Sequence, residues 1–234
     1  SLTTNGVMLS ENIEKIKAAG IKRINISLDT LNPEKFKYIT GYDLFDQIWA
    51  GIEASHAHGF DPIKLNVVAL RGYNDDEFVD LARLSLTYPF HIRFIEYMPI
   101  GNAQMKSSDY ILSNDIRTQI RVLGDLVPVE RKHMDGPAQR YKFKGARGEI
   151  GFIQAMSHHF CHTCNRLRLT ANGQLRPCLL SDKQLDIKGP LRSGCSDDEL
   201  KAVFLRAIQH KHESHHFAPG SPLRIHDSMS DIGG

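Results

Sequence analysis

Three of the four cysteines in this sequence stand at a spacing that is typical of a metal site. Cys161, Cys164 and Cys178 form the pattern C-x2-C-x13-C. A structural zinc ion takes four protein ligands, whereas an iron–sulfur cube held by three thiolates leaves one iron open to another ligand. Arg166 and Arg168 follow the pair, and a purely structural zinc ion needs no guanidinium group on its ligand loop. The pattern therefore favours an iron–sulfur cluster that faces an anionic ligand.

The spacing alone leaves a zinc site open as an alternative. Cys195 could be the fourth ligand of a zinc knuckle, although we interpret it as a bystander thiol. A histidine could instead complete a site of three cysteines and one histidine. The nearby histidines are His158, His159 and His162. The histidine-rich segment 210–216 could also bind a metal, but we interpret it as a solvated helix end.

Bulk composition is that of an ordinary globular protein, with 41% hydrophobic and 24% charged residues in 234. The formal charge of +2 excludes a general electrostatic attraction to nucleic acid, so any anion site must be local. A C-x2-C pair indicates a metal site in a reducing compartment rather than a disulfide framework. The sequence shows no signal peptide and no apolar run approaching the roughly 20 residues of a membrane span. We therefore expect a cytoplasmic protein.

Strands and helices alternate in the first hundred residues. Strands are expected at 23–28, 63–70 and 91–97, and helices at about 44–58 and from Asp75 or Asp76 to Leu86. A further helix is expected from an N-cap at Ser10 to a stop at Gly20. Alternation at this spacing predicts an α/β fold with a parallel sheet.

Polar residues interrupt the predicted strands: Lys64, Asn66, Arg93 and Glu96. Such groups are costly inside a barrel unless they line a site, and the carboxyl ends of barrel strands normally build that site. The alternative is that these residues face solvent, which is the weaker interpretation for parallel strands covered on both faces by helices.

After residue 101 the pattern changes to a polar loop at 101–109, a helix at 111–123 and short strands. These strands are expected at 141–143, 149–153, 167–170 and 175–179, and another helix at about 197–210. The Asn172-Gly173 pair is a strong hairpin signal. A hairpin there would bring Cys178 back beside the Cys161–Cys164 loop, which explains the long third spacing.

Several segments resemble the GTP 3′,8-cyclase family of molybdenum cofactor biosynthesis, which are radical S-adenosylmethionine (SAM) enzymes. They are Thr3-Thr-Asn-Gly6, Ile24-Asn-Ile-Ser-Leu-Asp29, Lys64-Leu-Asn-Val-Val68, Arg93-Phe-Ile-Glu-Tyr-Met-Pro99, Asp135-Gly-Pro-Ala138, Phe160-Cys-x-x-Cys-Asn-Arg-Leu-Arg168, Cys178-Leu179 and Gly233-Gly234. The resemblance covers essentially the whole chain in order. It implies the C-terminal part of an incomplete (β/α) radical SAM barrel at 1–100. A smaller α+β domain at 101–234 would bind GTP and a second iron–sulfur cluster.

The resemblance also implies roles for individual residues. The cluster would be a [4Fe–4S] cluster whose free iron binds the purine of GTP, held by Cys161, Cys164 and Cys178. Positions that would contact GTP are Thr3, Lys64, Arg166, Leu167 and Arg168, with Arg93 near the triphosphate. Ser27 and Met98 would contact SAM. The Gly233-Gly234 tail would thread into the active site, where only residues without side chains fit. Taken singly, Ser27, Lys64 and Met98 could equally be structural.

The implied reaction converts GTP into (8S)-3′,8-cyclo-7,8-dihydroguanosine 5′-triphosphate, which passes to a cyclic pyranopterin monophosphate synthase. In the family, a cluster on an N-terminal C-x3-C-x2-C motif reduces SAM and releases a 5′-deoxyadenosyl radical. No C-x3-C-x2-C occurs in these 234 residues, and the chain begins without methionine. We therefore expect the radical-generating portion to be missing from this chain and the chain alone to be inactive. A homodimer is also expected.

Two other functional classes remain open at this stage. One is a zinc-knuckle module that binds nucleotide or single-stranded nucleic acid through Arg166 and Arg168. Such binding normally adds stacking aromatics, and Phe160 is the only one near the cysteines. The other class is a non-catalytic remnant that retains the fold.

Overall fold

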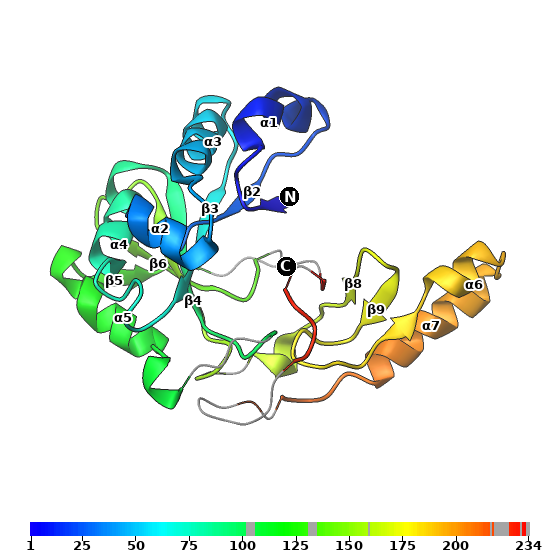
Figure 1. Cartoon of the computed structure of the whole chain (residues 1–234). Helices are drawn as coiled ribbons and strands as arrows, with labels where there is room; N and C mark the ends of the chain where they lie inside the picture. The colour runs from blue at the N-terminus through cyan, green and yellow to red at the C-terminus, as the bar shows by residue number, and fades with distance from the viewer. Residues whose placement is uncertain are drawn as a thin grey trace. The chain divides into compact units, whose positions relative to one another are not determined.

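A computed structural model describes residues 1–101, 106–130, 135–158, 160–215, 217, 225–229 and 231–232 (Figure 1). The chain forms two compact units. Unit 1 comprises residues 1–97 and 108–155, and unit 2 comprises residues 98–107 and 156–234. The division into domains at 1–100 and 101–234 stays a prediction.

Within its described residues, unit 1 carries a seven-stranded sheet in the order β1-β2-β3-β4-β7-β6-β5. The strands are β1 (Leu2–Thr4), β2 (Ile24–Ser27), β3 (Ile63–Ala69), β4 (Phe90–Glu96), β5 (Leu126–Pro128), β6 (Gln139–Phe143) and β7 (Glu149–Ile153). Strands β1 to β4 and β7 run parallel, whereas β6 and β5 add antiparallel. The predicted α/β fold with a parallel sheet is confirmed.

The helices of unit 1 follow the predicted alternation. They are α1 (Leu9–Ala18), α2 (Pro33–Thr40), α3 (Phe45–Ala57), α4 (Phe78–Thr87), α5 (Ser113–Ile120) and the short 3-10 helices η1 (Ser107–Asp109) and η2 (Arg121–Leu123). Helix α2 was not predicted, although its Asn32 N-cap, which accepts from two backbone N–H groups, and Pro33 are a standard start signal.

Two predicted helix starts were wrong. Helix α1 begins at Leu9 with Met8 as its N-cap, so Ser10 lies inside the first turn. Helix α4 begins at Phe78 and not at Asp75 or Asp76. The reason is the buried Asn74 side chain, whose amide donates to the carbonyls of Asp29 (2.6 Å) and Val68 (2.9 Å) and holds this segment in turns.

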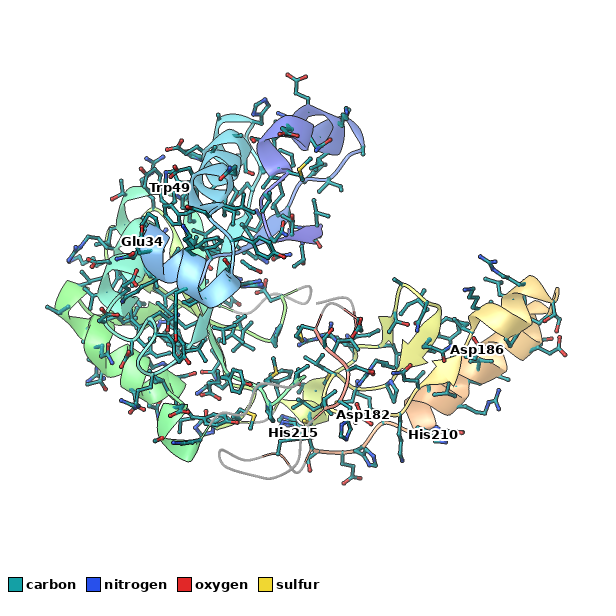
Figure 2. All side chains as sticks on the ribbon, in the orientation of Figure 1. Glu34, Trp49, Asp182, Asp186, His210 and His215 are labelled. Carbon is teal, nitrogen blue, oxygen red and sulfur yellow. The ribbon has the colours of Figure 1, made fainter. Side chains whose placement is uncertain are left out.

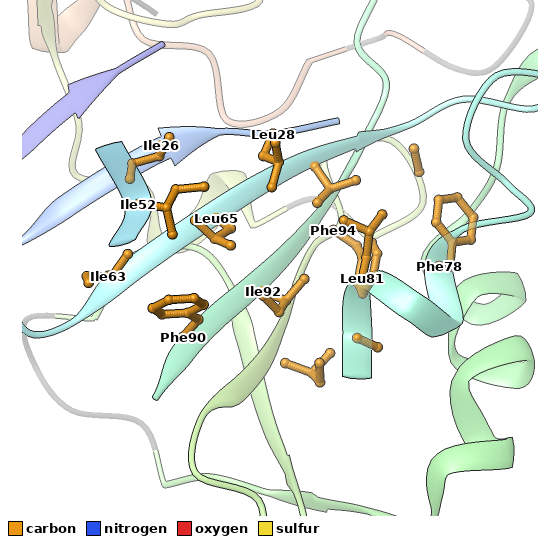
Figure 3. Close-up of a cluster of buried hydrophobic side chains, with 14 of the residues drawn as sticks. Ile26, Leu28, Ile52, Ile63, Leu65, Phe78, Leu81, Phe90, Ile92 and Phe94 are labelled. Atoms are coloured by element: carbon orange, nitrogen blue, oxygen red, sulfur yellow. The ribbon is translucent and has the colours of Figure 1, made fainter. Parts of the chain in front are cut away.

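Burial alternates along β3 and β4, so the two faces of the sheet differ sharply. One face packs under helices and forms the main core (Figure 3). Its members include Ile26, Leu65, Phe90 and Phe94 from the strands and Ile52 from α3. Each such side chain contributes roughly 1.5–3 kcal/mol when fully buried. The opposite face carries half-buried polar residues, and the core therefore fixes the strands that present them.

Unit 2 is smaller and has short elements. They are β8 (Arg168–Leu169), β9 (Gln174–Arg176), β10 (Leu185–Asp186), α6 (Lys188–Arg192), α7 (Asp197–Gln209) and the 3-10 helix η3 (Cys161–Thr163). The predicted hairpin is confirmed, since β8 and β9 pair antiparallel around a turn with Gly173 at φ +87°. A Cβ on Gly173 would lie 2.5 Å from the Cβ of Lys188, so the turn requires glycine. Helix α7 begins with a capping box of Ser196 and Glu199.

A second, small apolar cluster lies in unit 2, around Ile100, Leu180, Ile225 and Ile232. None of the helices formed by the described residues combines the length and the apolar character needed to cross a membrane.

Candidate functional site

The register of the parallel strands lines up two rows of polar residues on the open face of the unit 1 sheet. The first row is Thr3, Asn25, Lys64, His91 and Glu149, and the second is Ser27, Asn66, Arg93 and Gly151. Neighbouring strands lie about 4.8 Å apart, so residues in register are close neighbours. The sheet thus brings together four predicted site residues that are far apart in sequence: Thr3, Ser27, Lys64 and Arg93.

A cavity of about 310 Å³ opens over these rows. We call it the basic cavity. Its charged and titratable lining residues are Arg23, Asp61, Lys64, His91, Arg93, Asp135, Arg140 and Glu149. Lys64 and Arg93 both line this cavity, and their role in a functional site stays a prediction. Lys64 and His91 are the second residues of their strands, so this part of the cavity lies nearer the amino ends of β3 and β4 than the carboxyl ends at which the site was expected.

Glu96 does not belong to this site. It lies on the buried face of β4, 1% exposed, and accepts hydrogen bonds from the backbone N–H and hydroxyl of Ser113 (3.0 and 2.9 Å). Its carboxylate therefore anchors the start of α5. This contact accounts for the buried carboxylate in β4, and no bound ligand is needed to explain it.

Arg93 crosses the floor of the basic cavity. Its Nη1 donates to the side-chain oxygens of Asn25 (3.3 Å) and Asn66 (3.5 Å), the second contact being long. A Cβ on Gly151 would lie 3.2 Å from Arg93 Cγ, so the missing side chain on β7 leaves room for the arginine. Gly136 is similarly near, with Arg93 Nη2 3.5 Å from where its Cβ would be. Gly151 therefore gives Arg93 room against β7, whereas a Cβ at Gly136 would make only an ordinary contact.

Electrostatics in the basic cavity favour an anion. Burial, followed by the nearby charges of Arg93 and Arg23, lowers the pKa of Lys64 to about 8. Burial also lowers the pKa of His91, an effect that the charge of Glu149 opposes. Cations crowded at this density repel one another until an anion binds. The lining holds one more cation than carboxylates, which favours an anionic ligand.

Thr3 and Ser27 are both exposed on this face. Thr3 Oγ1 accepts a hydrogen bond of 3.1 Å from the side-chain amide of Asn25, which links it to Arg93. Ser27 is the last residue of β2. Close by in sequence, burial raises the pKa of Asp29 to about 6, while its carboxylate accepts from Val68 N at 2.8 Å.

Unit 2 contains a second, more apolar cavity of about 190 Å³, which we call the cysteine cavity. Its walls include all three predicted ligands, Cys161, Cys164 and Cys178. Burial raises the pKa of Cys178, and the neighbouring thiols of Cys161 and Cys164 act in the same direction. No three His, Cys, Asp or Glu side chains among the described residues are grouped closely enough to hold a single metal ion.

Segment 211–217 forms another wall of the cysteine cavity, through Lys211, His212, Ser214, His215 and Phe217. Figure 2 labels His210, which directly follows α7, and His215, which comes later in the same segment of the chain. Lys211 Nζ donates to the carbonyl oxygen of Arg166 (2.7 Å) and lies 3.4 Å from Cys164 Sγ. The interpretation of this segment as a solvated helix end was therefore wrong for Lys211.

Burial raises the pKa of Cys164, but the backbone N–H of Arg166 and the ammonium of Lys211 outweigh it and lower the pKa overall. Lowering a thiol pKa favours the thiolate, which is the form that binds metals. The donors around the cysteine cavity therefore suit an iron–sulfur cluster, whose usual ligands are thiolates.

The predicted arginines stand beside the cysteines. The Arg166 guanidinium lies over the Phe160 ring, 5.2 Å from its centre. Arg168 begins β8, and burial, followed by the charge of Arg166, lowers its pKa. The thiol groups of Cys178 and Cys164 act to raise the pKa of Arg168. Arg168 therefore lies within electrostatic reach of both cysteines. Leu167 is half-buried between the two arginines.

The remaining predicted residues have different surroundings. Met98 packs against the small apolar cluster of unit 2, as does Cys178. Cys195 lines a separate hollow between α6 and α7 and is absent from the cysteine cavity lining. Four predicted positions lie outside the described residues: His159, His216, Gly233 and Gly234.

Two known family models match the chain one after the other. Residues 1–85 match the radical SAM superfamily, and residues 90–217 match Molybdenum Cofactor Synthesis C. The fold and the site thus belong to a radical SAM protein of molybdenum cofactor biosynthesis.

Curated relatives define the family more narrowly. The GTP 3′,8-cyclase of Moorella thermoacetica is 49% identical over 234 residues, which is 100% of this chain and 72% of the relative. Those of Heliobacterium modesticaldum and Desulforamulus reducens are 45% and 46% identical, again over 100% of this chain and 72% of each relative. The chain belongs to the GTP 3′,8-cyclase family.

Proposed function

We propose that this chain contributes the GTP-binding residues and a [4Fe–4S] cluster to a GTP 3′,8-cyclase. The reaction would convert GTP into (8S)-3′,8-cyclo-7,8-dihydroguanosine 5′-triphosphate. The observation that carries the proposal is the meeting of Cys161, Cys164 and Cys178 at one cavity, with Arg168 within electrostatic reach of Cys164 and Cys178. A zinc knuckle offers no reason for that arginine.

The cysteine thiolates would hold the cluster, which supplies an iron atom with an open coordination position for the purine of GTP. Arg166 and Arg168 would bind oxygen atoms of GTP by charge-assisted hydrogen bonds, and Leu167 would pack against the nucleotide. The Arg166–Phe160 contact supports this role, since it orients the guanidinium group before a ligand binds. These residues bind and orient; they perform no proton transfer.

The basic cavity would bind the phosphate groups of GTP. Lys64 and Arg93 line it, and Thr3 extends the same hydrogen-bonded row through Asn25. A bound triphosphate would raise the pKa of Lys64 again, so binding would take up a proton near pH 8.

Ser27 and Met98 would contact SAM, and Gly233-Gly234 would reach the active site as a tail without side chains. Because these 234 residues contain no C-x3-C-x2-C motif, they would not generate a radical by themselves. The product would pass to a cyclic pyranopterin monophosphate synthase. The protein would act in the cytoplasm as a homodimer, and nucleic acid would not be among its partners.

The test is the electron paramagnetic resonance spectrum of the reduced protein after anaerobic iron–sulfur reconstitution. GTP should change the spectrum, because the purine binds the open iron, whereas inorganic tripolyphosphate should leave it unchanged. A protein that contains zinc and no sulfide would support the zinc-knuckle module instead. A cluster whose spectrum ignores GTP would contradict the purine-binding role.

A further inference from the structure

We propose that Arg140 is a positioning residue of the basic cavity, which keeps the cavity selective for polyphosphates by pairing with and neutralising the carboxylates of Asp135 and Glu149 beside Lys64 and Arg93. The inference rests on the proposed function, in that the polyphosphate is taken to be the triphosphate of GTP.

The contacts of Arg140 are strong and engage all three of its side-chain nitrogens. Nε and Nη2 donate to the two carboxylate oxygens of Glu149, each at 2.7 Å, and Nη1 donates to Asp135 at 2.5 Å. The three side chains are only 15–20% exposed. Such a bidentate pair is directional and well ordered. Arg140 is therefore committed to these carboxylates rather than to a ligand.

The position of Glu149 makes this commitment important. Glu149 stands in register with His91, which in turn stands in register with Lys64, so one neutral ring separates the carboxylate from the lysine. His91 Nδ1 lies 3.4 Å from Glu149, and burial keeps the imidazole neutral by lowering its pKa. Without Arg140, the bidentate ion pair of Glu149 would be lost, and its negative charge would stand two strands from Lys64.

The formal charges of the cavity lining nearly balance, so the loss of one cation matters. Its lining holds four cations, Arg23, Lys64, Arg93 and Arg140, and three carboxylates, Asp61, Asp135 and Glu149. The cations therefore exceed the carboxylates by one, and removing Arg140 makes the two sets equal. Although Arg140 would not touch the ligand, its loss would remove the attraction for a highly charged anion.

A purely structural role for Arg140 makes a different prediction. Arg140 on β6 also ties its strand to β7, since it is in register with Gly151. If that tie were its whole contribution, losing Arg140 would weaken binding whatever the charge of residue 149. If charge is what counts, removing the Glu149 carboxylate as well should restore binding.

Calorimetric titration of the full chain with inorganic tripolyphosphate, GTP and GMP separates these accounts. Arg140→Gln should weaken tripolyphosphate binding about tenfold, the scale for one unit charge near 10 Å at an effective dielectric constant of about 20. It should also reduce the preference for GTP over GMP. Arg140→Gln/Glu149→Gln should recover most of the lost affinity. Arg147→Gln, an exposed arginine that donates to Thr87 O, is the matched control and should bind like wild type.

The outcomes are distinct. If Arg140→Gln binds tripolyphosphate with wild-type affinity, the inference about Arg140 is overturned while the proposed function stands. An equal loss of affinity in the single and double variants has the same consequence. Failure of the wild-type chain to bind tripolyphosphate overturns the phosphate role of the basic cavity as well. Recovery in the double variant also shows that the substituted chain folds.

Discussion

The two cavities of this protein are built in opposite ways. The basic cavity of unit 1 stands on neighbouring strands whose register fixes each polar residue against a large buried core. The cysteine cavity of unit 2 stands on loops and a short 3-10 helix, next to a small apolar cluster. The first has its shape without a ligand. Under the proposed function, the second would need the iron–sulfur cluster to hold the thiolates together, because ligand binding and local folding are coupled at such sites.

This contrast predicts that cysteine substitutions act on cofactor retention and unit 2, whereas substitutions in the basic cavity act on anion affinity alone. Cys178→Ser should give the largest effect, complete loss of the reconstituted cluster, because two thiolates remain. Cys195→Ser is the matched control and should retain the cluster, since Cys195 lies at a separate hollow. Iron and sulfide analysis measures both. Equal loss in the two variants would contradict the assignment of three ligands.

Arg168→Ala should weaken GTP binding by about 1.5–3 kcal/mol, the range for a hydrogen bond to a charged group. Arg192→Ala, at the exposed end of α6, serves as the control. Calorimetry on the reconstituted protein measures the affinity. An unchanged affinity would remove Arg168 from the nucleotide site while leaving the cluster assignment intact.

Lys211→Met should speed the loss of iron to a chelator roughly tenfold, at the lower end of what removing an outer-sphere partner does to metal affinity. The lysine joins Cys164 to the carbonyl of Arg166, so its loss frees the ligand loop. Lys211→Arg keeps the charge and should stay closer to wild type. A chelation rate that is the same in all three proteins would show that the contact has no influence on the cluster.

The smallest effect concerns pH. Lys64 has a pKa of about 8 in the folded chain, below its ordinary value, so its charge is present below that pH and is lost above it. Tripolyphosphate affinity should therefore fall a few-fold as pH rises from 7 to 9. Lys64→Arg should bind with little change over this range, because arginine stays protonated. A parallel decline in both proteins would assign the titration to another group.

How much of this could be read from sequence differs between the two sites. The cysteine cavity was largely predictable, because C-x2-C and the Asn172-Gly173 turn are local signals that bring Cys178 back. Lys211 was missed, since it lies 47 residues from Cys164 in the sequence. Only folding brings such a pair together.

The basic cavity was half predictable. Lys64 and Arg93 stood out as charges inside apolar strands. Arg140 and Glu149 did not, because their strands are short and their importance depends on the sheet order β4-β7-β6, which no local pattern encodes. In the sequence, Glu96 and Arg93 are both charged residues in the same apolar strand. In the structure they lie on opposite faces of β4, so Glu96 anchors α5 whereas Arg93 lines the basic cavity.

Iron, sulfide and zinc content, measured with the absorbance spectrum after anaerobic purification and reconstitution, tests the central claim most directly. The account predicts about four irons and four sulfides per chain, with broad absorption near 400 nm. One zinc ion per chain without sulfide would contradict it and would make the cysteine cavity a structural zinc site.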